Sequence, residues 1–150
     1  MVIVPIAEVG LGFAPGSLTP TWGEVGAGVG LGRVEVVADA GAGLTYPTDR
    51  AYTYGLDPGW GFLGGGRARL RIPVGRVLVR PGVELGFEHR EQRNIFYEEP
   101  RGRTGARATA TAELVLPAAN GWLAIGMFGG YGTLPRNLLY GLTIHVGTTL

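Results

Sequence analysis

The chain has 150 residues, of which 28 are glycine, and it carries a formal net charge of +1 with no cysteine. The length suits one domain with a sizeable core. The near-neutral charge gives no reason to expect a nucleic-acid partner, and the lack of cysteine excludes disulfides, thiolate metal sites and cysteine nucleophiles. The uncharged run 114–135 is long enough for a membrane helix, but Pro117 and five glycines interrupt it, so we expect no such helix.

Apolar and polar residues alternate with a period of two along most of the chain, which predicts strands. Because each segment is long enough for a tilted membrane strand and no helix is available to cover a flat sheet, we predict an all-β fold. The expected fold is an eight-stranded antiparallel up-and-down transmembrane barrel, a single domain over residues 1–150. The eight predicted strands cover about 2–13, 22–32, 34–46, 60–73, 77–90, 104–116, 122–133 and 137–149.

The connections between these strands alternate in length. Short turns are expected at 32–33, 75–76 and 117–121, and a further short connection near 134–136. Long loops are expected at 14–21, 47–59 and 91–103. Short turns at one end and longer loops at the other are typical of outer-membrane barrels. Segments 32–46 and 75–89 also resemble each other, which fits a repeated hairpin unit.

The two faces of the strands differ in charge. One face is uncharged, while the other carries the charged residues, His145 and most of the strand glycines. We expect the charged face to point into a lumen, where small glycines offset large side chains and arginines pair with carboxylates. The predicted lumen network consists of Glu8, Glu24, Glu35, Asp39, Arg67, Arg69, Arg71, Arg80, Glu84, Glu88, Arg107 and Glu113.

Alternation alone also fits a soluble barrel, with the apolar face inside and a small apolar ligand in its interior. A designed transmembrane barrel without a biological task is a third reading. The large aromatic residues favour the membrane, because they share the apolar parity and lie near the long-loop ends of their strands, as an interface girdle does. They are Phe13, Tyr46, Trp60, Phe62, Phe87, Tyr131 and Tyr140.

Prolines inside predicted strands are the feature that fits least well, because proline cannot donate a ladder hydrogen bond. Pro5, Pro73 and Pro81 are the cases, and we expect them at bulges or close to the short turns.

Across its whole length the pattern resembles the small eight-stranded outer-membrane barrels of Gram-negative bacteria, the OmpA and OmpX type. The end, YGLTIHVGTTL, resembles the final strand that the outer-membrane assembly machinery recognises. That family usually closes with Phe and an aromatic residue two positions earlier, where this chain has Leu150 and Thr148. The resemblance implies a bacterial outer-membrane location, a lipid bilayer or detergent as surroundings, a monomer, and a structural or interaction role without catalysis.

No catalytic, metal or cofactor site is predicted. The one serine, Ser17, forms a hydrolase hypothesis with His89 and Glu88 or Glu91, but the lipid A deacylase pattern of His two residues before Ser is absent. The two histidines and scattered acids lack metal-ligand spacing. Segments 48–60 and 91–105, which contain the second and third long loops, are rich in tyrosine, arginine and glutamate. A candidate partner there is lipopolysaccharide, whose phosphates would meet Arg50, Arg93, Arg101 and Arg103.

Overall fold

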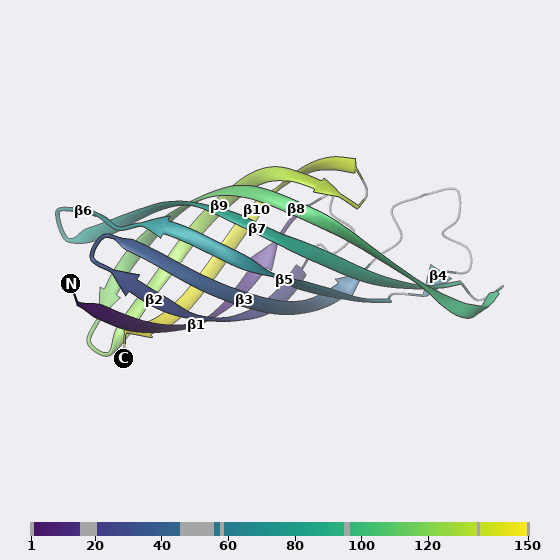
Figure 1. Ribbon diagram of the computed structural model, residues 1–150, viewed down its shortest axis with the longest axis horizontal. Helices are drawn as coiled ribbons and strands as arrows, with labels where there is room; N and C mark the ends of the chain where they lie inside the picture. The colour runs from purple at the N-terminus through teal and green to yellow at the C-terminus, as the bar shows by residue number, and fades with distance from the viewer. Residues whose placement is uncertain are drawn as a thin grey trace.

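The computed structural model describes residues 2–15, 21–45, 56–57, 59–94, 97–134 and 136–149. Within these ranges an antiparallel sheet closes on itself, because β1 pairs with β2 on one side and with β10 on the other (Figure 1). None of the described residues belongs to a helix that could cross a membrane. The strands are β1 (Ile3–Phe13), β2 (Thr21–Leu31), β3 (Val34–Thr45), β4 (Leu56–Asp57), β5 (Gly59–Leu70), β6 (Ile72–Val74), β7 (Val77–Asn94), β8 (Tyr97–Ala118), β9 (Gly121–Thr133) and β10 (Arg136–Thr149).

These elements make an eight-stranded wall, as the alternation predicts. β5 and β6 are two parts of one wall strand, since both pair with β7, and β4 is a two-residue pair at the far end of β7. Each of the remaining strands pairs with its neighbours in chain order. The predicted fold class, an eight-stranded antiparallel up-and-down barrel, is therefore confirmed.

The break between β5 and β6 lies opposite a proline. The register pairs Arg69 with Gly82 and Ile72 with Val79, so Leu70 stands across from Pro81, which has no N–H to donate. Pairing with β7 stops there, whereas on the other side of the strand the Arg71 N–H donates to the Arg33 carbonyl at 2.7 Å, which continues the β3–β5 register. The break explains how the wall accommodates a proline that sequence reasoning placed in mid-strand.

Two of the short turns need glycine for its backbone conformation. Gly32 and Gly75 have φ values of 62° and 63°, and each is the first residue of a two-residue hairpin loop followed by arginine. A glycine of positive φ at that place is typical of a type II′ turn, which suits the twist of a hairpin. The repeated Gly-Arg-Val of the sequence therefore marks two equivalent turns at the same end of the barrel (Figure 1).

The prediction of a long loop over 91–103 is wrong for most of that segment. β7 continues to Asn94 and β8 starts at Tyr97, with Gln92 paired to Arg101, so the two strands project together past the rest of the wall (Figure 1). Apart from residues 95–97 the sequence of this segment is mostly polar, so it lacks the apolar alternation that reveals a strand. Continued backbone pairing defines this extension, which we call the β7–β8 arm (residues 91–94 and 97–103).

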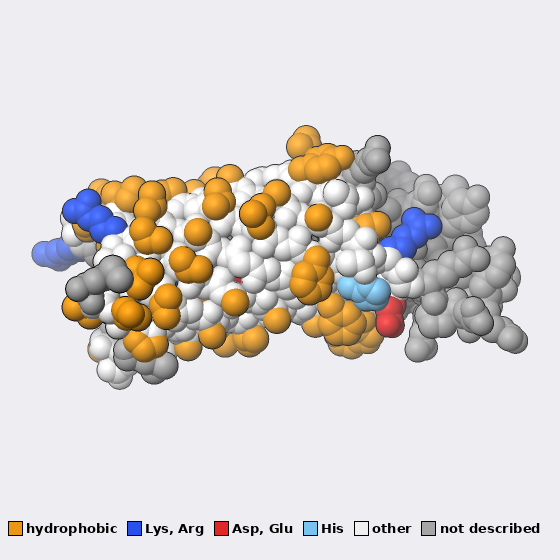
Figure 2. Space-filling view, in the orientation of Figure 1, with side chains coloured by type: hydrophobic (Ala, Val, Ile, Leu, Met, Phe, Trp, Pro, Cys, Tyr) orange, Lys and Arg blue, Asp and Glu red, His pale blue; other side chains and the backbone are white. Residues whose placement is uncertain are grey.

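The wall carries its apolar side chains outward and its charges inward. Val36 and Leu142 are 46% and 55% exposed, whereas Arg69 and Glu84 are 1% and 7% exposed. In the space-filling view, hydrophobic side chains cover the central wall and charged ones appear at its two ends (Figure 2). A soluble barrel needs the reverse, so the soluble alternative is wrong, and this is the arrangement of a transmembrane barrel.

Candidate functional site

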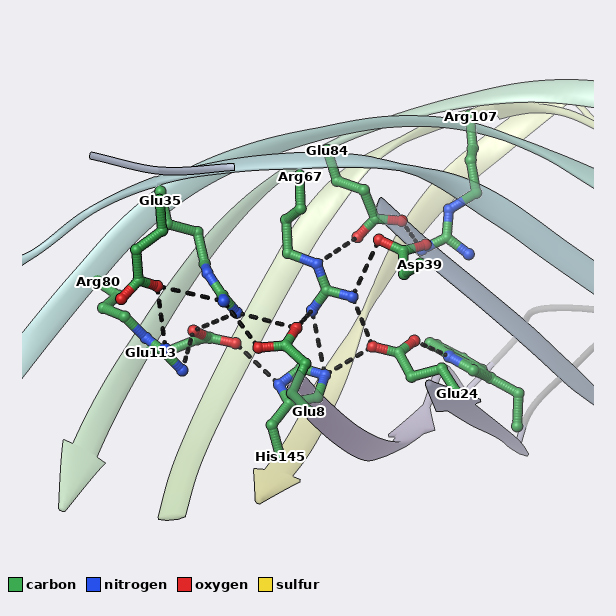
Figure 3. A network of polar contacts seen from close by, with 12 residues as sticks. Glu8, Glu24, Glu35, Asp39, Arg67, Arg80, Glu84, Arg107, Glu113 and His145 are labelled. Atoms are coloured by element: carbon green, nitrogen blue, oxygen red, sulfur yellow. Dashed lines mark hydrogen bonds and ion pairs between the residues drawn. The ribbon is translucent and has the colours of Figure 1, made fainter. Parts of the chain in front are cut away.

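The interior of the barrel holds a network of ion pairs (Figure 3). Of the twelve side chains that parity assigns to the lumen, eleven are at most 9% exposed; Arg71, near the short turns, is 33% exposed and lies 3.4 Å from Glu35. Because an unpaired charge is costly to bury, each arginine must find carboxylates inside. The contacts fall into a middle group around Arg67, a second group around Arg69 and Arg80, and two further pairs, of which Arg107 with Glu84 adjoins the Arg67 group.

Arg67 is at the centre of the first group. Its guanidinium lies 2.6 Å from Glu24 and 3.2 Å from Asp39, on β2 and β3. Glu8 and Glu84 are farther, at 3.8 and 3.9 Å. One arginine on β5 thus connects carboxylates from four other strands across the lumen.

Arg69 and Arg80 share their acceptors in the second group. Arg69 contacts Glu8 at 2.7 Å, Glu35 at 3.2 Å and Glu113 at 3.5 Å. Arg80 contacts Glu113 at 2.9 Å and Glu35 at 3.2 Å. The two guanidinium groups can lie close together because Glu35 and Glu113 each contact both of them.

His145 joins the two groups, a role that sequence reasoning did not assign although its parity was noted. It is 1% exposed, and its Nδ1 lies 2.9 Å from Glu113 while its Nε2 lies 2.6 Å from Glu24. A carboxylate accepts hydrogen bonds, so both ring nitrogens are placed to donate, as in an imidazolium. Arg67 shares Glu24 as an acceptor with His145, because its Nη2 donates to the same carboxylate oxygen, while its Nη1 lies 3.1 Å from Nε2 without donating to the ring.

Two further pairs lie toward the long-connection end. Arg107 donates to Glu84, and Arg90 lies 2.6 Å from Glu88. Arg90 is 3% exposed and was missing from the predicted network, although it is the last residue of the strand predicted over 77–90. Its even position on β7, shared with Glu84 and Glu88, is the signal that would have found it.

The network is covered on both sides by apolar side chains. Toward the long connections Ala14, Trp22, Leu63, Phe128 and Leu139 pack together. Toward the short turns Ile6, Val115, Trp122 and Ala124 form a second buried cluster. Along β1 and the residue after it, the order of inward residues puts Glu8 between Ile6 and Ala14, so the central charges lie between two apolar layers.

A tryptophan in each apolar layer also contacts the arginines. The Arg80 guanidinium is 4.0 Å from the centre of the Trp122 ring, and Arg107 is 5.7 Å from that of Trp22. A guanidinium over an aromatic face is attracted to it, and the attraction grows when both are removed from water. Sequence reasoning overlooked these tryptophans because it collected aromatics of apolar-face parity alone.

The predicted girdle aromatics face outward where they are described. Phe13, Trp60, Phe62, Phe87, Tyr131 and Tyr140 are 46–57% exposed, and Tyr46 lies outside the described residues. Their position at the membrane interface stays a prediction.

Two residues of the hydrolase hypothesis, His89 and Glu88, point to opposite faces of β7. His89 lies on the outer face, where its Nδ1 is 2.8 Å from Thr104 Oγ1, while Glu88 points inward and is 4% exposed. Ser17 lies outside the described residues, and so does Arg50 of the predicted lipopolysaccharide contact. Glu88 is therefore not placed to act as the acid partner of His89.

Comparisons with known proteins agree on the fold. No family model and no curated protein matches the chain. Among solved structures, neisserial surface protein A (NspA) aligns over 99% of this chain and 97% of its own, with a TM-score of 0.71 and 14% identity. A major outer membrane protein from Thermus thermophilus aligns over 100% of both chains, with a TM-score of 0.63 and 12% identity. Ail from Yersinia pestis, in complex with the heparin analogue sucrose octasulfate, aligns over 98% of this chain and 95% of its own, with a TM-score of 0.54 and 12% identity.

This is the fold of the small eight-stranded outer-membrane β-barrels. The resemblance to that group, predicted from strand pattern and loop lengths, is therefore confirmed at the level of the fold. At these identities the likeness carries no residue-by-residue correspondence, so the lumen network is described from this chain alone.

Proposed function

We propose that the protein is a non-catalytic barrel of a bacterial outer membrane, with a solid interior and a structural or interaction role at its surface. The observation that carries this proposal is the lumen filled by paired charges between two apolar layers. An eight-stranded barrel is just wide enough for its side chains, so a network of this size leaves no room for a wide channel. The outer-membrane location is supported by the fold shared with outer-membrane proteins.

Planar-bilayer recording tests the closed interior. The purified barrel, inserted at the density at which a porin control gives clear steps, should show no stable channel across a range of voltages. A variant with both inner tryptophans shortened, Trp22→Ala with Trp122→Ala, should raise the leak. A stable open channel in the unaltered protein would contradict the proposal.

The β7–β8 arm is the part of the described chain best suited to an interaction. It extends past the wall, and its sequence carries Arg93, Arg101 and Arg103, with Gln92 across from Arg101 in the backbone register. Arginines that bind phosphate through paired N–H groups suit the anionic surface of lipopolysaccharide. The structure of Ail with a sulfated sugar gives a precedent for an anionic ligand on this fold.

Titration of the barrel in detergent with lipopolysaccharide tests this second proposal. Binding should weaken several-fold in the variant Arg101→Gln with Arg103→Gln, and on removal of the lipid's phosphates. Arg33→Gln with Arg76→Gln, which removes as much charge at the opposite end, is the matched control and should bind like the unaltered chain. Equal affinity in all three chains would exclude the arm as the site.

A further inference from the structure

The outer wall has a groove that is bordered by outward-pointing apolar side chains. Its volume is about 530 Å³, and it crosses β1, β2 and β3 toward β10 on one side and β5 on the other. Leu11 and Phe13 on β1 form one wall of the groove, and Leu44 on β3 with Trp60 on β5 forms the other. The volume falls within the range of about 300–1,000 Å³ that is usual for small-molecule sites.

The floor of the groove is made by missing side chains. In the register, Leu11 lies beside Gly23, and Gly23 lies beside Ala42. Side-chain size across this row therefore falls from leucine to the hydrogen of glycine and the methyl group of alanine. A Cβ added at Gly23 would have Leu11 as its nearest neighbour, 4.0 Å away. No neighbouring side chain therefore fills the hollow above Gly23, and it opens outward.

The position of the groove decides what can occupy it. It is continuous with the apolar band that faces lipid, in which Leu11 is 66% exposed and Trp60 is 57% exposed. Inside a bilayer the surrounding medium is hydrocarbon, so a chain that fits the hollow gains packing contacts that it lacks against a smooth wall. None of the side chains lining the groove is charged, so the lining offers no cation for the phosphates of lipid A.

We propose that this groove retains one acyl chain of a membrane phospholipid, held longer than the lipids around the rest of the wall. The inference goes beyond the proposed function, since it concerns the outer surface and needs neither a closed lumen nor an active arm. Its observable consequence is a phospholipid that stays with the barrel through detergent extraction at a ratio of one to one.

Trp60 provides a direct probe of occupancy. It is the outward tryptophan, because Trp22 and Trp122 are 5% and 8% exposed inside the lumen. Titrating delipidated barrel in micelles with a phospholipid brominated on its acyl chains should quench tryptophan fluorescence in a saturable way. Trp60→Phe should remove that saturable part. Quenching that rises linearly with lipid, without saturation, would overturn the proposal.

Two glycine variants separate the groove from the rest of the wall. Gly23→Leu fills the hollow, whereas Gly129→Leu adds the same side chain to the outer face of β9, where a Cβ meets nothing within 4 Å. Native mass spectrometry should find the retained phospholipid on the unaltered barrel and on Gly129→Leu, and at least tenfold less on Gly23→Leu. If Gly23→Leu fails to fold, Ala42→Phe fills the same floor. Equal retention in all chains, none in the unaltered chain, or lipid A in place of phospholipid would overturn the proposal.

Discussion

Gly10 and His145 stand directly opposite each other in the β1–β10 pair, and the ring of His145 occupies the space that a side chain at residue 10 would need. The same pairing recurs across the lumen, where a large inward residue faces a glycine on the next strand. The pairs are Glu8 with Gly26, Trp22 with Gly12, Arg69 with Gly82, Glu113 with Gly126 and Trp122 with Gly147. The lumen glycines are therefore part of the packing of the network.

Adding one methyl group at Gly10 tests this relationship. Gly10→Ala should lower the free energy of unfolding by about 1–3 kcal/mol, because the methyl group forces the His145 ring away from its carboxylates. Gly129→Ala, which points outward into open space, is the matched control and should be close to neutral. Urea titration of both variants in the same lipid vesicles measures the difference, and an equal cost for the two would contradict the packing argument.

Removing one central arginine should cost more than removing an exposed one. Arg69→Met leaves Glu8, Glu35 and Glu113 with one fewer cation in a buried place, so the expected loss in unfolding free energy is about 3–5 kcal/mol. Arg76→Met, in an exposed turn, should change it by about 0.5 kcal/mol or less. If the two substitutions had the same effect, the lumen network would not contribute to stability as described.

The two histidines of the chain form a natural comparison. His145→Ala takes a donor from both Glu24 and Glu113, and the expected destabilisation is about 2–4 kcal/mol, since two buried acceptors each lose a partner. His89→Ala removes one outer-face contact to Thr104 and should cost about 1 kcal/mol or less. Unfolding curves by tryptophan fluorescence decide between them, and a larger cost for His89 would refute the joining role of His145.

An arginine on the outer wall tests the lipid-facing surface. Leu85 is 66% exposed near the middle of β7. The substitution Leu85→Arg should lower the free energy of unfolding by about 2–4 kcal/mol, because the charge would lie near the middle of the bilayer. Val74→Arg, beside the short turn, should cost about 0–1 kcal/mol. Refolding into vesicles measures both, and two small, equal costs would place this wall in water.

Strand number, strand order and the two faces could be predicted from sequence because a barrel wall imposes a period of two on every strand. Val36 and Arg69 lie on the predicted sides for that reason. The alternation shows on which side of the wall a side chain lies but not which side chains meet at one height in the lumen. It therefore could not show that Trp22 and Trp122 form layers above and below the charges. It also could not show that Arg67 and His145, which are far apart in sequence, meet through Glu24.

Other differences arise where backbone pairing acts without a side-chain pattern. The sequence of the β7–β8 arm is mostly polar, so it has no apolar alternation, although its backbone register is continuous with the wall to Gln92. The division of β5 from β6 depends on Pro81, which is a residue of the neighbouring strand. The groove over Gly23 likewise depends on which residues become neighbours across β1, β2 and β3, and this register is not readable from any one strand.

The most direct test of the inverted barrel is a spin-label scan along β9 in lipid vesicles, using single cysteines, since the chain has none of its own. Leu123, Ile125 and Met127 are 36%, 51% and 63% exposed on the outer wall. Labels at these positions should collide freely with oxygen dissolved in the bilayer and be protected from a water-soluble nickel reagent. Labels there that meet the nickel reagent and not the lipid-dissolved oxygen would contradict the account, because they would put the apolar face of the barrel in water.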